Sequence, residues 1–354
     1  MQEESLTFLC ELLKAPSPSG YEQPAQRLFR KYIDPFSEVT QDVLGNVVGF
    51  IPGIGQRRPK VILIGHSDEI GFIVKFIDES GFIYFGVIGD VNTQLMHGRR
   101  VDIHTKNGVV TGVVGVKASH LIESKENGRE MDVQYIDIGA TSKQQAESLV
   151  QVGDPVTFTE TFARLHGDRA TSRGFDNKAG IFIVAEVMRH IAEAKGRLPV
   201  DLFGVSSTQE EIGLRGGVTS AYAFNPDIAI CVEVDPCTDI PTSDKKCSSE
   251  IRLGKGPILP RGANINPLLF DLLATTAENE GIPVQYSAAP RATGTDANVI
   301  QISRSGVATA LVKIPLRYMH TPVEVISLCD VDQTITLLVK TLTRFGDKYD
   351  FIPA

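Results

Sequence analysis

Two adjacent glutamates, Glu210 and Glu211, follow an apolar run, LPVDLFGVSST, that has the composition of a buried strand. Neighbouring side chains on a strand point to opposite faces, so both carboxylates reach one site only if the chain turns. The glycine-rich IGLRGG that follows supplies such a turn. Two like charges so close raise each other's pKa unless cations lie between them. The pair therefore predicts that one carboxylate binds metal and the other is a general base toward an activated water, and the alternative is a solvated acidic loop.

Other metal-capable residues stand where predicted strands end or where a helix begins. The carboxyl ends of parallel strands meet at one edge of a sheet, which is where ligands bind in open α/β sheets. These residues are His66 and Asp68 after KVILIG, Asp176 before a long amphipathic helix, Glu233 and Asp235 at the end of AICVEVD, and His320 after VATALVKIPLRYM.

Each of these residues also has an ordinary structural explanation. Asp176 is in position to cap the helix that follows it. His66 is open to an incidental role, and His320 to a structural one. Either Glu233 or Asp235 could be a ligand, because both lie on the same face of one strand. Their joint placement at one sheet edge favours a metal site.

The donor types indicate the kind of metal. Imidazole nitrogen combined with carboxylate oxygen suits zinc, and cobalt and manganese accept the same ligands. Two histidines cannot saturate two ions, so carboxylates must bridge and complete the site. We expect two divalent ions per subunit, zinc first and cobalt or manganese as alternatives, about 3.5–4 Å apart. A zinc site at Cys231 and Cys237 is the weaker alternative, because no second cysteine pair completes it.

The elements that must position these residues alternate between strand and helix patterns. Such alternation predicts an α/β fold, a mostly parallel sheet with helices on both faces. Residues 72–162 differ, because they are rich in strand patterns and carry a hairpin turn at Asn107-Gly108. We therefore expect a catalytic domain formed by residues 1–71 and 163–354, interrupted by a small β-rich insert at 72–162.

The composition of the chain narrows the classes of partner that it is expected to bind. The chain has 354 residues, 42% apolar and 22% charged, with a formal net charge of -8. It carries no dense block of lysine and arginine, so neither nucleic acid nor a membrane surface is an expected partner. Neither a signal peptide nor a run of about 18 apolar residues is present, so a cytoplasmic protein is expected.

Seven segments, in this order, together resemble the M42 metallopeptidases, a family of glutamyl, deblocking and tetrahedral aminopeptidases. The resemblance covers essentially the whole chain. The segments are GHSDEIGF, RGFDNKAG, TQEEIGLRGG, VEVDPCTDIP, LGKGPILPRGANINP, GTDANVIQISRSGVATALV and IPLRYMHTPVEV.

The resemblance implies a zinc-peptidase-like fold, a PDZ-like dimerisation domain as the insert, dimers that assemble into a dodecamer, and short peptides as substrates. It also implies a cis peptide bond between Asp176 and Asn177. By motif, His66 and Glu233 would bind one ion, Asp176 would bridge both, Glu211 and His320 would bind the second, Glu210 would be the general base, and Asp68 would support His66.

The chain departs from the family pattern at two positions. The family's usual residue at the position of Glu233 is Asp, so Asp235 remains an alternative. Asn177 stands where many members have Asp, which should be tolerated because this side chain is not normally a ligand.

Two rival functions and the side-chain preference remain open. Some members carry an endoglucanase label, but adjacent glutamates beside histidines fit metal chemistry better than a glycosidase pair. A non-catalytic scaffold should lack the base or the bridging ligand, and this sequence has both. Arg215 and Arg291 are conceivable partners for an acidic substrate side chain.

Overall fold

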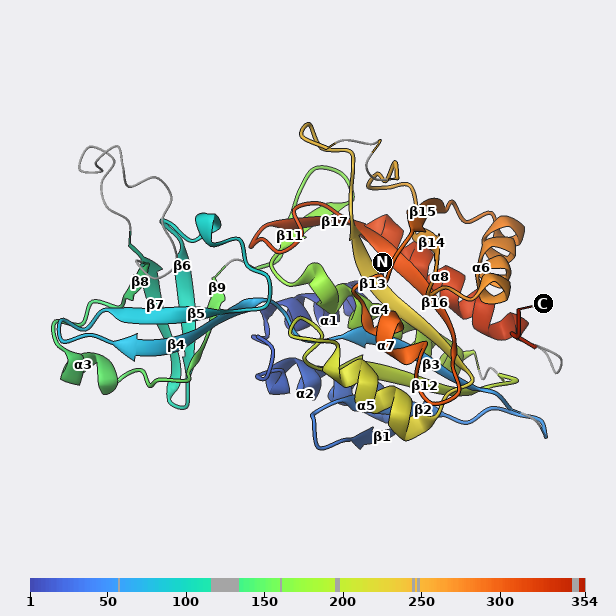
Figure 1. Ribbon diagram of the computed structural model, residues 1–354, viewed down its shortest axis with the longest axis horizontal. Helices are drawn as coiled ribbons and strands as arrows, with labels where there is room; N and C mark the ends of the chain where they lie inside the picture. The colour runs from blue at the N-terminus through green and yellow to red at the C-terminus, as the bar shows by residue number, and fades with distance from the viewer. Residues whose placement is uncertain are drawn as a thin grey trace.

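The computed structural model describes residues 1–56, 58–115, 134–159, 161–194, 198–243, 246, 249–345 and 350–353. Figure 1 shows two parts, a small barrel at one end and a large sheet with its helices at the other. Within the described residues, no helix combines the length and the apolar character needed to cross a membrane.

The large part is built on an eight-stranded sheet. Its central pairs, β12 with β3, β3 with β13 and β13 with β16, are parallel, while β1, β2 and β14 join through antiparallel pairs. Along the sheet the strands are β1 (Glu38–Gln41), β2 (Val47–Ile51), β12 (Asp201–Ser207), β3 (Lys60–His66), β13 (Ile228–Pro236), β16 (Ala308–Leu316), β14 (Ile258–Gly262) and β15 (Gln285–Ala289).

Helix α4 (Phe175–Glu193) packs along β3, β12 and β13, and it also contacts α1, α2 and α8. Helices α5 and α7 pack against each other and against strands of the same sheet, and α6 lies against α8, β14 and β16. The other helices are α1 (Glu3–Lys14), α2 (Gln23–Ile33), α3 (Lys143–Glu147), α5 (Arg215–Phe224), α6 (Pro267–Glu280), α7 (Asp296–Ile300) and α8 (Leu328–Arg344), with short 3₁₀ turns η1 (Asp34–Phe36) and η2 (Thr93–Leu95).

A glycine contact sets the distance between β3 and α4. Every residue of β3 after Lys60 is buried, as expected for a central parallel strand. A Cβ built on Gly65 would lie 2.9 Å from the carbonyl carbon of Gly180, closer than side chains tolerate. Glycine at 65 therefore lets the strand and the helix approach closely, and these two elements carry His66 and Asp176.

The second part is a closed six-stranded barrel with its own apolar core, which includes Phe72, Val101 and Ile136. A turn at Lys106-Asn107 joins two of its strands, so the predicted hairpin is present with its turn one residue earlier than Asn107-Gly108, and Gly108 begins β7. In barrel order the strands are β4 (Gly71–Ile77), β5 (Ile83–Ile88), β8 (Tyr135–Asp137), β7 (Gly108–Val114), β6 (Arg100–Thr105) and β9 (Pro155–Phe158). The predicted mixed α/β fold with a small β-rich unit is thus confirmed.

A small third sheet lies beside the N-terminus of α4. It contains β10 (Ala163–Arg164), β11 (Arg169–Ser172) and β17 (Glu324–Ser327), all antiparallel. Strand β17 follows the loop that carries His320, so this sheet brings the end of β16 next to the start of α4.

Candidate active site

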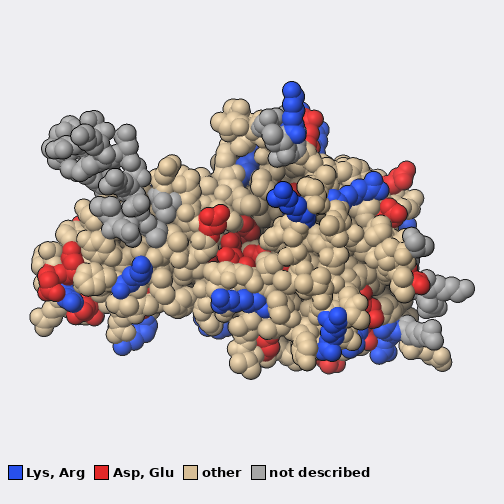
Figure 2. All heavy atoms as spheres, viewed as in Figure 1, with Lys and Arg blue, Asp and Glu red and all other residues tan. Residues whose placement is uncertain are grey.

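The sequence-predicted residues meet at the carboxyl edge of the large sheet. His66 ends β3, Glu233 lies near the end of β13, and Asp176 stands in the first turn of α4. The loops after β12 and β16 add the two glutamates and His320. Six of these residues line one cavity of about 500 Å³, namely His66, Asp176, Glu210, Glu211, Glu233 and His320. Figure 2 shows acidic side chains gathered in a hollow near the middle of the molecule.

Asp176 faces both imidazoles, one with each carboxylate oxygen. Its Oδ1 lies 3.3 Å from Nε2 of His66, and its Oδ2 lies 3.3 Å from Nε2 of His320. Glu211 Oε2 is 3.5 Å from the His320 nitrogen, and Glu233 Oε2 is 3.7 Å from the His66 nitrogen. The arrangement is that of a central carboxylate flanked by two imidazole–carboxylate pairs.

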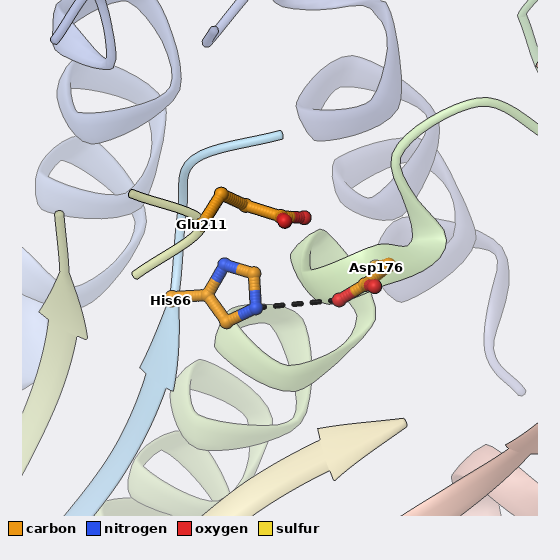
Figure 3. A group of neighbouring side chains, drawn as sticks. All are labelled: His66, Asp176 and Glu211. Carbon is orange, nitrogen blue, oxygen red and sulfur yellow. Dashed lines mark ion pairs between the residues drawn. The ribbon is translucent and has the colours of Figure 1, made fainter. Parts of the chain in front are cut away.

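Two groups of side chains in the described part of the chain could hold a metal ion. One is His66, Asp176 and Glu211, which converge in Figure 3, and the other is His66, Glu210 and Glu233. The ligand atoms of each group lie within 4.8 Å of one another. His320 falls outside both groups, although it contacts Asp176 and Glu211.

Asp68 explains how two consecutive glutamates can address one site. Its Oδ1 accepts the backbone N–H of Glu210 at 3.0 Å, and its Oδ2 accepts that of Glu211 at 3.0 Å. Ser19 Oγ also donates to Oδ2 at 2.7 Å, and His66 Nδ1 lies 3.4 Å from Oδ1. Asp68 therefore holds both the glutamate turn and the first imidazole, and it is fully buried while doing so.

Burial makes the three glutamates of the cavity hard to ionise in the absence of a cation. Burial raises the pKa of Glu210 to about 8. Burial and the charge of Asp176 raise the pKa of Glu211 well above its ordinary value, and burial also raises the pKa of Glu233 well above it. Among the described residues, Oε1 of Glu211 and Oε1 of Glu233 are buried without any hydrogen-bond partner.

Asp176 and the two histidines, in contrast, have pKa values shifted toward their charged forms. Burial opposes charge on His66, but the carboxylates of Glu210 and Glu233 outweigh it and raise the pKa of His66 well above its ordinary value. The hydrogen bond to Asp176 raises the pKa of His320. Although burial opposes ionisation of Asp176, the two imidazoles lower its pKa.

Divalent metal cations fit this donor set. Several carboxylates and two imidazoles face one another, and two buried oxygens lack a partner. The lysine that lines the cavity, Lys313, donates to Asp235 at 2.8 Å, so its charge is already paired. Buried charges are stable only when they are paired or coordinate metal.

Comparison with known proteins gives the family. Residues 45–337 match the model of the M42 glutamyl aminopeptidases. A lysyl aminopeptidase from Pyrococcus furiosus is 37% identical over 349 residues, covering 97% of this chain and 98% of that protein. The chain belongs to the M42 family. The expectation of an enzyme that hydrolyses peptide bonds is confirmed by this membership.

Solved structures agree with the M42 assignment. A TET aminopeptidase from the archaeon Thaumarchaeota archaeon SCGC AB-539-E09 superposes with a TM-score of 0.92 at 32% identity, covering 98% of this chain and 97% of that one. The Pyrococcus horikoshii protein PhTET1-12s, described as a dodecamer, has a TM-score of 0.86 at 26% identity, with 98% and 100% coverage. A Thermotoga maritima protein named as an endoglucanase has a TM-score of 0.76 at 26% identity, with 94% and 96% coverage.

Asn177 and Glu233, the two residues at which the resemblance implies a departure from the family pattern, touch each other. Asn177 Nδ2 donates to Oε2 of Glu233 at 2.8 Å and to the carbonyl of Val232 at 2.8 Å. The peptide bond between Asp176 and Asn177 is cis, as the resemblance implies. An amide at 177 can donate to Glu233, which an aspartate could not do when ionised.

Sequence reasoning missed two buried acids next to this M42 site. Asp296 at the start of α7 accepts from Ser207 Oγ at 2.7 Å, and burial raises its pKa to about 6. Glu324 on β17 accepts backbone N–H groups from two of the candidate ligands. Both lie inside segments quoted for the resemblance, but no local signal in the sequence marks either one as a buried acceptor.

Of the arginines considered for substrate recognition, Arg215 donates to Gln209 Oε1 at 3.1 Å, and neither Arg215 nor Arg291 lines the described cavity. Cys231 and Cys237 are buried free thiols, and neither belongs to a described metal-capable group.

Proposed function

We propose that the protein is a dinuclear-metal-dependent aminopeptidase that removes N-terminal residues from short peptides. The observation that carries this proposal is the position of Asp176, whose two oxygens face two imidazoles, each paired with a further buried carboxylate. M42 membership supplies the reaction class.

The residues would divide into two ligand sets that share Asp176. His66 and Glu233 would complete the first, and Glu211 and His320 the second. Glu233 is preferred to Asp235 because Asp235 already accepts from Lys313, whereas an oxygen of Glu233 is unpartnered among the described residues. When bound, two zinc, cobalt or manganese ions polarise the scissile carbonyl and lower the pKa of the attacking water.

Glu210 is the proposed general base. Its side chain reaches the cavity, with Oε2 3.8 Å from Nε2 of His66, and its backbone is fixed by Asp68. It would accept a proton from the attacking water and pass that proton to the leaving amine nitrogen. Its pKa, raised toward neutral pH, suits a group that must both accept and release a proton.

Glu210→Gln tests this role. We expect it to keep its metal content but lose peptidase turnover by about 10²- to 10⁴-fold, because the amide cannot accept the proton. Turnover is measured on a panel of amino-acid 4-nitroanilides, with metal content from elemental analysis. Glu278→Gln, on the exposed side of α6, is the matched control and should leave both unchanged.

The same assay also tests the alternative role of Glu210, in which its carboxylate is a metal ligand. If Glu210→Gln instead releases metal, then Glu210 binds metal together with His66 and Glu233 and does not act as the base. Near-normal turnover with full metal content would contradict both roles.

The two rival functions make different predictions. A glycosidase uses two carboxyl groups about 5–9.5 Å apart and normally no transition metal, so its activity on cellulose should survive a chelator. A scaffold should show no turnover with any added metal. We expect peptide hydrolysis that a chelator abolishes.

We further infer the domain roles. Residues 72–162 would form a PDZ-like dimerisation domain, residues 1–71 and 163–354 the catalytic domain, and dimers would build a dodecamer like that described for PhTET1-12s. The barrel supports this by exposing Phe76, Val109 and Val113. Contacts of α4 and of α5 with the same strands support helices on both faces of the sheet. A cytoplasmic location accords with this role.

A further inference from the structure

Glu324 is a buried carboxylate that does not line the cavity and forms no ion pair with a basic side chain in the described part of the chain. It is 1% exposed and lies on β17, where it pairs with Ser172 at the end of β11. Ser172 lies three residues before the first residue of α4, so Glu324 lies beside the start of that helix.

Both oxygens of Glu324 accept backbone N–H groups from candidate metal ligands. Oε2 accepts the N–H of Asp176 at 3.1 Å, and Oε1 accepts the N–H of His320 at 3.2 Å. Asp176 belongs to α4 and His320 to the loop after β16. One carboxylate therefore connects two ligands that lie 3.3 Å apart at their side-chain atoms.

The loop that carries His320 needs such a connection. His320 has a φ of 60° and Tyr318 a φ of 62°, and residues other than glycine seldom adopt this left-handed conformation. His320 lies outside every regular element, so no ladder of hydrogen bonds fixes its backbone. The direction of the His320 imidazole depends on the backbone conformation of His320. Glu324 links this backbone to the backbone of Asp176.

We propose that Glu324 is a positioning residue that aligns His320 and Asp176 for the second metal ion. The proposal rests on the proposed dinuclear function, and it assigns Glu324 no contact with metal or substrate. Partners that orient metal ligands typically change metal affinity or activity by about 10- to 100-fold when they are mutated.

Glu324→Gln tests the proposal without changing the side-chain volume. A glutamine has one acceptor oxygen, so it can satisfy only one of the two N–H donors. Asp330→Asn is the matched control: Asp330 is a fully buried carboxylate that also accepts two backbone N–H groups, from Gly254 at 2.7 Å and Gly256 at 2.8 Å, on segments that do not line the cavity.

The measurement is a titration of metal-free full-length protein with Co²⁺ against a competing chelator, followed by visible absorption. Wild type should bind two Co²⁺ per chain. Glu324→Gln should bind the second Co²⁺ about 10- to 100-fold more weakly, with an altered cobalt spectrum, and the first should be weakened less, because His66 and Glu233 do not depend on Glu324. Asp330→Asn should bind both as wild type does, even if its melting temperature falls.

Three results would overturn the proposal. Two wild-type-like binding steps in Glu324→Gln would remove the role of Glu324 and leave the proposed function intact. Equal weakening in Asp330→Asn would show a general effect of losing a buried carboxylate. A wild type that takes up no Co²⁺ would end the proposed function and this inference together. Glu324→Ala, which removes both acceptor oxygens, should weaken binding of the second Co²⁺ further. If the alanine variant does not fold, the result for Glu324→Gln decides the test.

Discussion

At the scale of single residues, the geometry of the site depends on which backbone N–H groups its buried carboxylates accept. Asp68 accepts the N–H groups of both Glu210 and Glu211, so their turn has a fixed shape before any ligand arrives. Catalytic groups gain most when they are held in place beforehand. The sequence predicts a turn there from its glycines, but it gives no sign that the anchor is a residue about 140 positions earlier.

Asp68→Asn should lower kcat by about 10- to 100-fold. The asparagine oxygen can accept only one of the two N–H groups, so the turn that presents Glu210 loosens. Steady-state kinetics with metal analysis checks this. Ser19→Ala is the control, because it removes a hydrogen bond to Asp68 and leaves both amide contacts, so its effect should be clearly smaller. A wild-type kcat in Asp68→Asn would contradict the anchoring role.

At the scale of elements, a buried ion cluster fastens β3 to α4. Glu69 contacts Arg173, and it accepts from Lys178 Nζ at 2.8 Å. Ser17 N–H also donates to Glu69 Oε1 at 2.9 Å. Although burial opposes ionisation, the two cations lower the pKa of Glu69 to about 2. The segments that carry His66 and Asp176 are therefore joined a second time, beside the Gly65–Gly180 contact.

The cluster predicts how stability depends on pH. The pKa of Glu69 is lower in the folded state than its ordinary 4.5, so its contribution is complete above about pH 5 and is lost as pH falls toward 2. Between these values, wild type should lose roughly 2–3 kcal/mol more unfolding free energy than Glu69→Gln.

Denaturant unfolding at several pH values, with a chelator present throughout, measures this difference. Glu280→Gln, which removes an exposed glutamate paired with Lys340 and Arg344, should follow the wild-type pH dependence closely. Identical pH slopes for Glu69→Gln and wild type would contradict the prediction.

The elements themselves were readable from the sequence, while their contacts were not. The alternation of apolar strands and amphipathic helices predicts the sheet, and the strand ends locate His66, Glu233 and the glutamate pair. Glu324 and Asp296 escape this reasoning, because their roles arise from hydrogen bonds between distant segments. Nothing local distinguishes a buried acceptor of backbone N–H groups from an ordinary strand or cap residue.

At the scale of the whole molecule, the barrel predicts self-association. Its exposed apolar side chains include Phe76, at 53%, and Val109, at 60%. Light scattering should give a mass of several times 38.5 kDa, up to about twelve subunits. Val109→Asp should shift the population to smaller species, because it places charge in an apolar contact. Val43→Asp, at an exposed position outside the barrel, should not. A monomer at every concentration would contradict the assembly.

The central claim is that residues from five segments enclose two cations around Asp176. Elemental analysis after dialysis against excess zinc, followed by removal of free ions, tests it most directly. We expect two zinc ions per wild-type chain and fewer than one in Asp176→Ala, with both proteins folded by circular dichroism. A folded wild-type protein that remains free of ions after zinc and cobalt treatment would contradict the account.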